Sequence, residues 1–548
     1  MAKMTLTAPP SRRLLAATLL VGLTRLAGAP VVVPVLAQTP PPALVVVLVV
    51  DQMRADTIER YGRQWTAGLR RLLDEGAVFR EAKITYFGTL TCAGHATIAT
   101  GTVPATHGVL LDGWWDPVAG RRVRCTADPG VTAVPYGPGA REQHGPGTLL
   151  VPTLADELRL QQNPPARVAA FAVKARAAVP LAGQRADAVA WFDPGNVWTT
   201  STAFTQTPVP FVDEFVRAHP VDAALGQVWT PPSHGTDASS NAEPPAFAYT
   251  IAGEGGAPDR DFYTLWRRSP LADEYVAGLA IAAVDALDLG AGTGTDYLAI
   301  GFSAADYVGH DFGPWSPEIE DVYRRLDRTI GRLFAHLDRT VGRDRYVVAF
   351  SADHGVGPIP EEAAALGLDA GRIDRNAVIA HVNEVLEPFF GPGAHAVGMS
   401  HIEFYFAPGV YNRLIATPDA LAAVIDALER YPGVQRVFRG ETLTAGPFAD
   451  PLTRQVARSY YPGRSGDLVI IPKPYWYTWI RPADHGTGYD YDTRVPLILA
   501  GPGISPGRYT RAAAPEDIAP TLAFLAGVTL ARPDGRVLTE ALAGGARP

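Results

Sequence analysis

Short apolar runs recur along the chain and are separated by longer amphipathic stretches. The runs are rich in β-branched residues and do not alternate with polar ones, which predicts strands buried on both faces of a sheet. Leucines at helical spacing in 66–79, and similar patterns in 273–287 and 317–341, predict helices between them. Strands that alternate with long helices indicate an α/β fold, a mostly parallel sheet sandwiched by helices. The predicted strands are 43–50, 166–173, 296–302, 345–350 and 494–500.

Three regions do not follow this alternation. Residues from about 109 to 165 and from about 180 to 270 are rich in Trp, Pro, Gly and Ser. Residues from about 360 to 483 contain a small α+β pattern. We expect all three to be insertions in one catalytic domain, residues 43–548, and to form a cap over the carboxyl edge of its sheet.

The first 37 residues have the pattern of an export signal. Lys3, Arg12 and Arg13 precede an apolar run, and residues 35–37 form a small-residue cleavage site before Gln38. A membrane anchor is the alternative, although Arg25 and two prolines interrupt the run. No other stretch approaches the roughly 18 apolar residues of a membrane span. The sequence predicts a periplasmic or secreted protein.

The charge balance narrows the choice of partner. The formal net charge is −8, with a pI near 5.9, and no basic stripe is present, so nucleic-acid binding is not expected. Small molecules are the expected partners, and nothing in the sequence compels assembly beyond a monomer. The two cysteines, Cys92 and Cys125, could pair in an exported protein, but the sequence leaves both the bonded and the free state open.

Acidic and histidine side chains gather where the predicted strands end. The carboxyl ends of neighbouring parallel strands meet at one edge of a sheet, where α/β folds bind their ligands. A mixed set of carboxylates and imidazoles suits Zn²⁺ better than Mg²⁺ or Ca²⁺, and six such ligands are enough for two ions. The six residues are Asp51, Asp306, His310, Asp353, His354 and His485.

Thr91 lies where a helix is predicted to begin. A helix N-terminus favours negative charge, so a hydroxyl held there beside a metal is a candidate nucleophile for a phosphoryl group. A plain N-cap is the alternative interpretation, and Thr89 is a rival hydroxyl. Lys174 and Arg176 follow another strand; they could bind phosphate oxygens or belong to a solvated edge.

Taken together, these motifs resemble the alkaline phosphatase superfamily, and within it the periplasmic PafA-type enzymes that use threonine. The resemblance rests on segments 88–108, 305–314, 352–355 and 485–499 and on Lys174-x-Arg176. It implies hydrolysis of phosphate monoesters through a phosphothreonine on Thr91, with release of inorganic phosphate. The resemblance implies one zinc on Asp306, His310 and His485, and another on Asp51, Thr91, Asp353 and His354.

One residue departs from the family pattern. Asp112 stands where the family has an asparagine that donates to a phosphoryl oxygen, and an ionised aspartate offers only acceptors. The side chain could also point away from the site. Three functions therefore stay open: a phosphomonoesterase, favoured by Lys174 and Arg176; a phosphodiesterase or phosphonate-ester hydrolase; and a catalytically silent phosphate-ester binder.

Overall fold

The computed structural model describes residues 40–116, 119–140, 142–231, 246–478 and 480–544. The predicted signal, residues 1–37, lies outside the described residues. Among the residues described, no helix combines the length and apolar character needed to cross a bilayer.

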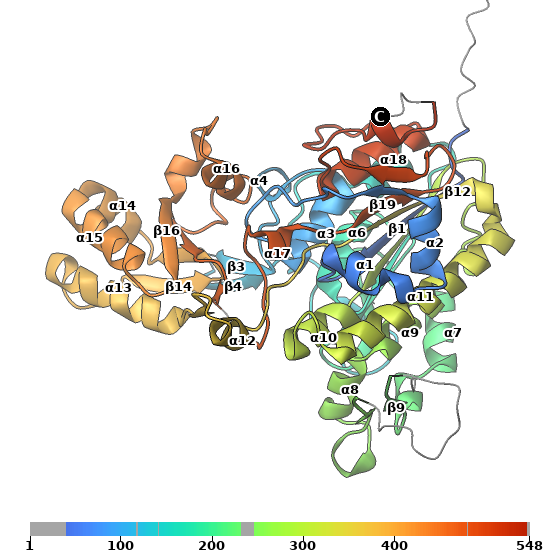
Figure 1. The fold of residues 1–548 in the computed structure, drawn as a ribbon, viewed down its shortest axis with the longest axis horizontal. Helices are drawn as coiled ribbons and strands as arrows, with labels where there is room; N and C mark the ends of the chain where they lie inside the picture. The colour runs from blue at the N-terminus through green and yellow to red at the C-terminus, as the bar shows by residue number, and fades with distance from the viewer. Residues whose placement is uncertain (1–39, 117–118, 141, 232–245, 479, 545–548) are drawn as a thin grey trace, which may run out of the picture. The chain divides into compact units, whose positions relative to one another are not determined.

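A ten-stranded sheet forms the centre of the fold (Figure 1). Its five middle strands, β12, β1, β11, β6 and β7, run parallel to one another. Antiparallel pairs flank them, with β19 beside β12 on one side and β8 beside β7 on the other. The mostly parallel α/β sheet predicted from the sequence is confirmed. In spatial order the strands are β20 (Gly507–Tyr509), β2 (Ala77–Phe79), β19 (Leu497–Ala500), β12 (Tyr346–Ser351), β1 (Leu44–Val50), β11 (Asp296–Phe302), β6 (Val168–Ala172), β7 (Ala188–Asp193), β8 (Val197–Ser201) and β5 (Ala133–Pro135).

Strand register brings three of the predicted ligands to one place. Val50, the last residue of β1, pairs with Phe302 at the end of β11. On the other side, Val49 pairs with Ser351 at the end of β12. The residues that follow these ends therefore share one short stretch of the carboxyl edge. Every residue of β1 is buried, as its unbroken apolar run predicts.

Alternate residues of β1 point to opposite faces of the sheet, and helices pack against both faces. Leu44, Val46, Leu48 and Val50 join one core cluster, and the valines at the odd positions join another. The predicted helices are confirmed, except that residues 77–79, at the end of the first predicted helix, form strand β2. The first cluster includes residues of α2 (Gly68–Glu75), α9 (Pro270–Ala286), α10 (Ala304–Phe312) and α11 (Pro317–Leu337). The second includes residues of α3 (Thr91–Thr100), α5 (Leu154–Gln161), α6 (Ala175–Ala182) and α18 (Ile518–Ala526).

Parts of two ranges expected to be insertions belong to the central sheet. β7 and β8 lie within 180–270, and β5 lies within 109–165. The expectation that these ranges form only a cap is wrong for those strands. β7 ends in Asp193 and β5 has three residues, and the Pro-, Gly- and Ser-rich composition of the surrounding sequence hid both strands. Between the strands and α9, the range 180–270 also forms α7 (Pro210–Ala218) and α8 (Arg260–Arg267).

The α+β pattern after residue 360 forms a separate four-stranded antiparallel sheet with its own hydrophobic cluster. A hairpin of β3 (Gly113–Asp116) and β4 (Arg121–Arg124) is joined to it, because Ser400 Oγ donates to the Gly113 carbonyl at 2.6 Å. Both elements lie next to each other in Figure 1. The sheet comprises β14 (Ala396–Ser400), β15 (Glu403–Phe406), β17 (Leu468–Pro472) and β16 (Val434–Arg439), with α13 (Arg375–Phe390), α14 (Val410–Ala416), α15 (Pro418–Glu429) and α16 (Pro451–Ala457) beside it.

A buried acid in this smaller sheet makes its stability depend on pH. Glu403 on β15 accepts the Gly466 N–H at 2.7 Å, and burial raises its pKa to about 8. The unfolded chain loses this proton near pH 4.5, whereas the folded chain keeps it until about pH 8, so stability falls as pH rises between these values. We expect Glu403→Gln to flatten the fall in Tm from pH 5 to 8, measured by calorimetry. Glu387→Gln, on an exposed face of α13, should leave the slope unchanged; an equal slope in both variants would contradict this account.

Candidate active site

The chain turns sharply after β1, and this turn ties three strand ends together. Gln52 adopts a left-handed conformation with φ 71°, which a non-glycine residue rarely does. Its backbone N–H donates to Asp353 Oδ1 at 3.1 Å, and its side-chain amide donates to Asp306 Oδ1 at 2.9 Å. Gln52 was missed in the sequence, where its position directly after Asp51 was the only signal.

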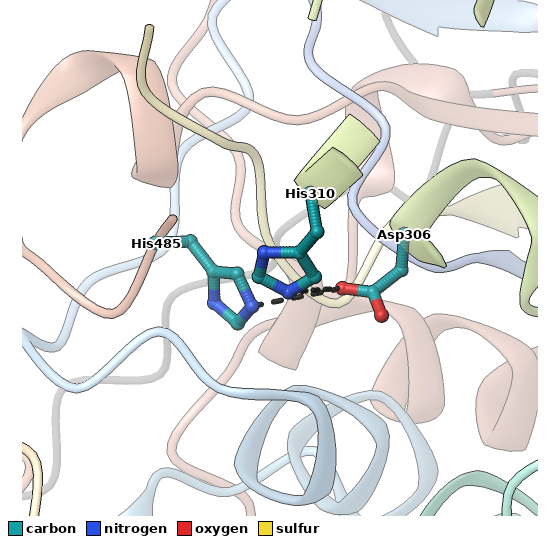
Figure 2. Close-up of side chains that lie close together, drawn as sticks. All are labelled: Asp306, His310 and His485. Carbon is teal, nitrogen blue, oxygen red and sulfur yellow. Dashed lines mark ion pairs between the residues drawn. The ribbon is translucent and has the colours of Figure 1, made fainter. Parts of the chain in front are cut away.

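The first candidate ligand group lies at the start of α10. Asp306 and His310 are four residues apart, so they share one face of the helix. The Nε2 atoms of His310 and His485 lie 3.1 and 3.6 Å from Asp306 Oδ1 (Figure 2). Figure 2 shows both rings turned toward this carboxylate, one from the helix and one from a distant loop. These three buried residues could hold one metal ion.

The three histidines share one hydrogen-bond pattern. The Nδ1 atoms of His310, His354 and His485 lie 2.7, 2.9 and 2.8 Å from main-chain carbonyl oxygens. Because a carbonyl oxygen only accepts, each Nδ1 must carry the proton. Each neutral ring then carries its lone pair on Nε2, the form that binds metals. Burial alone would lower the pKa of His485, but Asp306 and Asp484 raise it to about 9, so this ring must lose a proton to bind a metal.

A second candidate group consists of Asp51, Asp306 and His354. His354 Nε2 lies 3.5 Å from Asp51 Oδ1 and 3.4 Å from Asp353 Oδ2. Asp51 Oδ1 is buried without a hydrogen bond, and Asp353 Oδ2 lies 3.2 Å from His95 Nδ1. Buried acceptors without donors are costly, and a cation would satisfy them, so the residues fit a metal. Asp306 thus belongs to both candidate groups, and Asp353 lies next to the second group.

The carboxylates repel one another strongly. Burial, followed by the charges of Asp306 and Asp353, raises the pKa of Asp51 well above its usual range. Burial acts on Asp306 in the same sense, but Lys174 and His310 hold its pKa well below the usual range. Burial also lowers the pKa of His354 to about 3, so this imidazole is neutral at physiological pH. Divalent cations would remove the repulsion and bind a neutral ring.

Thr91 is the first residue of α3, and Leu90 occupies the N-cap, so Thr91 is not the helix cap. Its Oγ1 lies 3.4 Å from His354 Nε2. The rival Thr89 hydroxyl instead donates to the Thr487 carbonyl at 2.8 Å. All ten residues of α3 are buried, and a Cβ on Gly94 would lie 2.3 Å from the Asp353 carbonyl oxygen. This close approach, which only glycine allows, sets the helix against the second ligand group.

Lys174 and Arg176 do not form a solvated edge. Lys174 is 3% exposed; its Nζ donates to Asp51 Oδ2 at 2.6 Å and also pairs with Asp306. Arg176 Nε lies 2.9 Å from Asp112 Oδ2, and Asp112 Oδ1 accepts the Cys92 N–H at 2.9 Å. Asp112 therefore faces the site. Burial alone would raise its pKa, but Arg176 and this amide lower it, so the carboxyl is ionised.

A small cavity of about 90 Å³ opens over these groups. Thr91, Asp112 and Arg176 line it from one side, and Ser400 and His401 line it from the smaller sheet. A larger cavity of about 580 Å³, lined by Arg54 and Arg494 among others, contains none of the predicted site residues. Of these two cavities, the smaller one is lined both by the candidate nucleophile Thr91 and by residues of the smaller sheet.

Cys92 and Cys125 form a disulfide, which settles the question that the sequence left open. It closes a loop between residues 33 positions apart and removes Cys92 as a thiol nucleophile. By loop-closure entropy, Cys92→Ala/Cys125→Ala should lower the free energy of unfolding by about 3–4 kcal/mol. Denaturant unfolding of the wild type and the double variant checks this. A loss below about 1 kcal/mol would show that the cross-link contributes little.

Comparison with solved structures supports the fold. Wild-type alkaline phosphatase PafA superposes with a TM-score of 0.82 at 29% identity, over 92% of this chain and 99% of PafA. An inactive murine ectonucleotide pyrophosphatase / phosphodiesterase 5 in complex with AMP superposes with a TM-score of 0.55 at 14% identity, which shows a shared fold only. A second structure of the murine protein superposes with a TM-score of 0.53 at 13% identity.

Sequence relatives match over most of the chain. They include alkaline phosphatase PhoV from Synechococcus elongatus, 30% identical over 91% of this chain and 93% of PhoV, and PafA from Elizabethkingia meningoseptica, 30% identical over 89% and 92%. A Myroides odoratus protein named calcium-transporting ATPase is 32% identical over 91% of this chain and 94% of its own length.

The fold, the site and these relatives define an enzyme of the alkaline phosphatase class that hydrolyses phosphate esters. The chain belongs to the type I phosphodiesterase / nucleotide pyrophosphatase family, whose model matches residues 45–489. The resemblance found in the sequence is confirmed.

Proposed function

We propose that this enzyme hydrolyses phosphate monoesters, with Thr91 as the nucleophile and two zinc ions as cofactors. One observation carries the proposal: Thr91 Oγ1 at the start of α3 lies 3.4 Å from His354 Nε2, in the cavity that also holds Arg176. A nucleophile, metal ligands and a phosphate-binding cation thus meet in one small space.

The donor set supports zinc. Imidazole Nε2 atoms and carboxylates are ligands that Zn²⁺ accepts readily. One ion would be held by Asp306, His310 and His485, and the other by Asp51, Asp353, His354 and Thr91. When bound, two such ions supply Lewis-acid stabilisation of the attacking and the leaving oxygen.

The chain's own groups orient the two displacements. Thr91 Oγ attacks phosphorus and loses its proton to solvent, while the ester oxygen leaves with its electron pair and is protonated as the alcohol. Water then attacks the phosphothreonine, the bond from phosphorus to Oγ breaks, and inorganic phosphate and the Thr91 hydroxyl result. The N-terminus of α3 and Arg176 stabilise the charge on the phosphoryl oxygens in both steps.

The spacing of the cationic residues favours monoesters. A solved PafA variant carries replacements of a threonine, an asparagine, a lysine and an arginine, spaced along PafA as Thr91, Asp112, Lys174 and Arg176 are spaced here. A monoester offers more charged oxygens to Lys and Arg than a diester does. The Asp112–Arg176 pair favours the second candidate, a diesterase, because the aspartate offsets part of this positive charge.

The deciding experiment compares kcat/KM on p-nitrophenyl phosphate and bis-p-nitrophenyl phosphate for zinc-loaded protein. We expect a preference for the monoester. A preference for the diester would support the second candidate. No turnover of either substrate by protein that contains zinc would leave the silent binder as the remaining interpretation.

Asp112→Asn tests the departure from the family pattern. Asparagine keeps the shape, removes a negative charge beside the phosphoryl site and offers an N–H donor. We expect kcat/KM for the monoester to rise by about tenfold, which corresponds to about 1.4 kcal/mol of transition-state stabilisation. Asp311→Asn, which removes a nearby acid that does not line the cavity, is the control and should leave kcat/KM unchanged. An unchanged or lower kcat/KM in Asp112→Asn would show that the carboxylate itself assists turnover.

Two further features fit this proposal. The N-terminal pattern and the disulfide are typical of an exported enzyme, so we infer a periplasmic or secreted location. The terminal phosphate of ATP carries the charge of a monoester, so hydrolysis of ATP would need no other site.

A further inference from the structure

Arginines surround the mouth of the active-site cavity. Arg122 reaches it from the β3–β4 hairpin, and Arg481 reaches it from the loop that leads to His485. Both line the cavity together with Arg176, although the chain as a whole carries a net charge of −8. Positive charge is therefore concentrated at this opening, although the net charge of the protein is negative.

Among the described residues, no carboxylate lies within ion-pair distance of the two outer arginines, although the charge of Arg481 acts on Asp311. Asp112 is paired with Arg176, and Asp484 lies deeper, with Oδ1 3.9 Å from His310 Nδ1. Within the described part of the chain, neither Arg122 nor Arg481 forms an ion pair. Arg122 Nε donates a long hydrogen bond to Ser400 Oγ at 3.4 Å, and its terminal nitrogens make no hydrogen bond to the residues that the structure describes.

Cavity size decides which part of a substrate reaches these arginines. The cavity is small, about 90 Å³, so a phosphoryl group beside Thr91 takes up most of it. In-line attack by Thr91 directs the alcohol part away from α3. The alcohol must therefore lie at the mouth, between the hairpin and the loop that carries Arg481.

We propose that Arg122 and Arg481 bind a carboxylate on the alcohol part of the substrate, which makes phosphorylated hydroxy acids the preferred class of monoester. This inference rests on the proposed phosphatase function and names its substrate class. A guanidinium group binds a carboxylate through two parallel hydrogen bonds, and a guanidinium whose nitrogens face the cavity can make this contact. Since Arg122 is exposed, its contribution is modest and decreases with salt.

The test uses two substrates that differ in one group. D-2-phosphoglycerate carries a carboxylate where glycerol 2-phosphate carries a hydroxymethyl group. We expect zinc-loaded wild type to prefer D-2-phosphoglycerate in kcat/KM. The ratio of the two values should fall about threefold in Arg122→Gln or Arg481→Gln and about tenfold in the double variant. It should also fall in 0.5 M salt, because screening weakens exposed charge pairs.

Arg124→Gln is the matched control, since Arg124 lies on the same strand but pairs with Glu142 and does not line the cavity. Its ratio should equal that of the wild type. A wild type without the preference, or a double variant with an unchanged ratio, would overturn the inference while turnover of glycerol 2-phosphate still supports the phosphatase. Failure to hydrolyse either substrate would overturn both.

Discussion

Thr91→Ala should lower kcat/KM on p-nitrophenyl phosphate by at least about 10⁴-fold, because removal of a catalytic nucleophile typically costs that much. The alanine keeps the first turn of α3, in which Leu90 and not Thr91 is the N-cap, so the fold should persist. Steady-state kinetics and zinc content, measured on the same preparation, separate a lost nucleophile from a lost metal.

Two related variants make the result specific. Thr91→Ser restores a hydroxyl and should recover activity to within about 10²-fold of the wild type, since only a methyl group is missing. Thr89→Ala removes the neighbouring hydroxyl, whose hydrogen bond goes to the Thr487 carbonyl. Brief exposure to labelled substrate followed by acid should label the wild type on threonine and leave Thr91→Ala unlabelled. Turnover in Thr91→Ala near the wild-type rate would remove Thr91 from the mechanism.

Asp306→Asn should have the second largest effect, a loss of about 10³-fold in kcat/KM, because a metal supplies several kcal/mol of transition-state stabilisation. Asp306 belongs to both candidate ligand groups, and an amide is a weaker ligand than a carboxylate. Elemental analysis after dialysis should show fewer than two zinc ions per chain.

Asp311→Asn is the control for this change. Asp311 also lies on α10, but its carboxylate pairs with Arg268 at 2.9 Å and belongs to neither ligand group. This variant should keep its zinc and most of its activity. Full zinc occupancy in Asp306→Asn would contradict the placement of the metals, whatever the activity.

The central strands and the gathering of three candidate ligands were predictable for the same reason. The runs that became β1, β11 and β12 are mostly apolar, and polar residues that follow such runs lie at the carboxyl edge. Asp51, Asp306 and Asp353 follow such runs, so the order of residues along the chain was enough to predict that they lie close together.

Other features depend on contacts that a sequence does not contain. The sequence around β7 resembles a loop-rich region, and its short apolar run is recognisable as a strand only from its pairing with β6. The proton positions of the three imidazoles depend on carbonyl groups supplied by distant loops, as with Thr89 and His485. That Asp112 faces the site depends on the Cys92 amide and Arg176, which the fold brings to it.

A helix with no exposed side, such as α3, cannot shift without opening the core. Variation that retunes this enzyme for other substrates must therefore accumulate elsewhere. Strand β4 (Arg121–Arg124) and the loop that carries Arg481 are the segments where substitutions reach the substrate and leave the helix untouched. A library of variants restricted to these two segments would sample new substrate specificities while the catalytic residues stay unchanged.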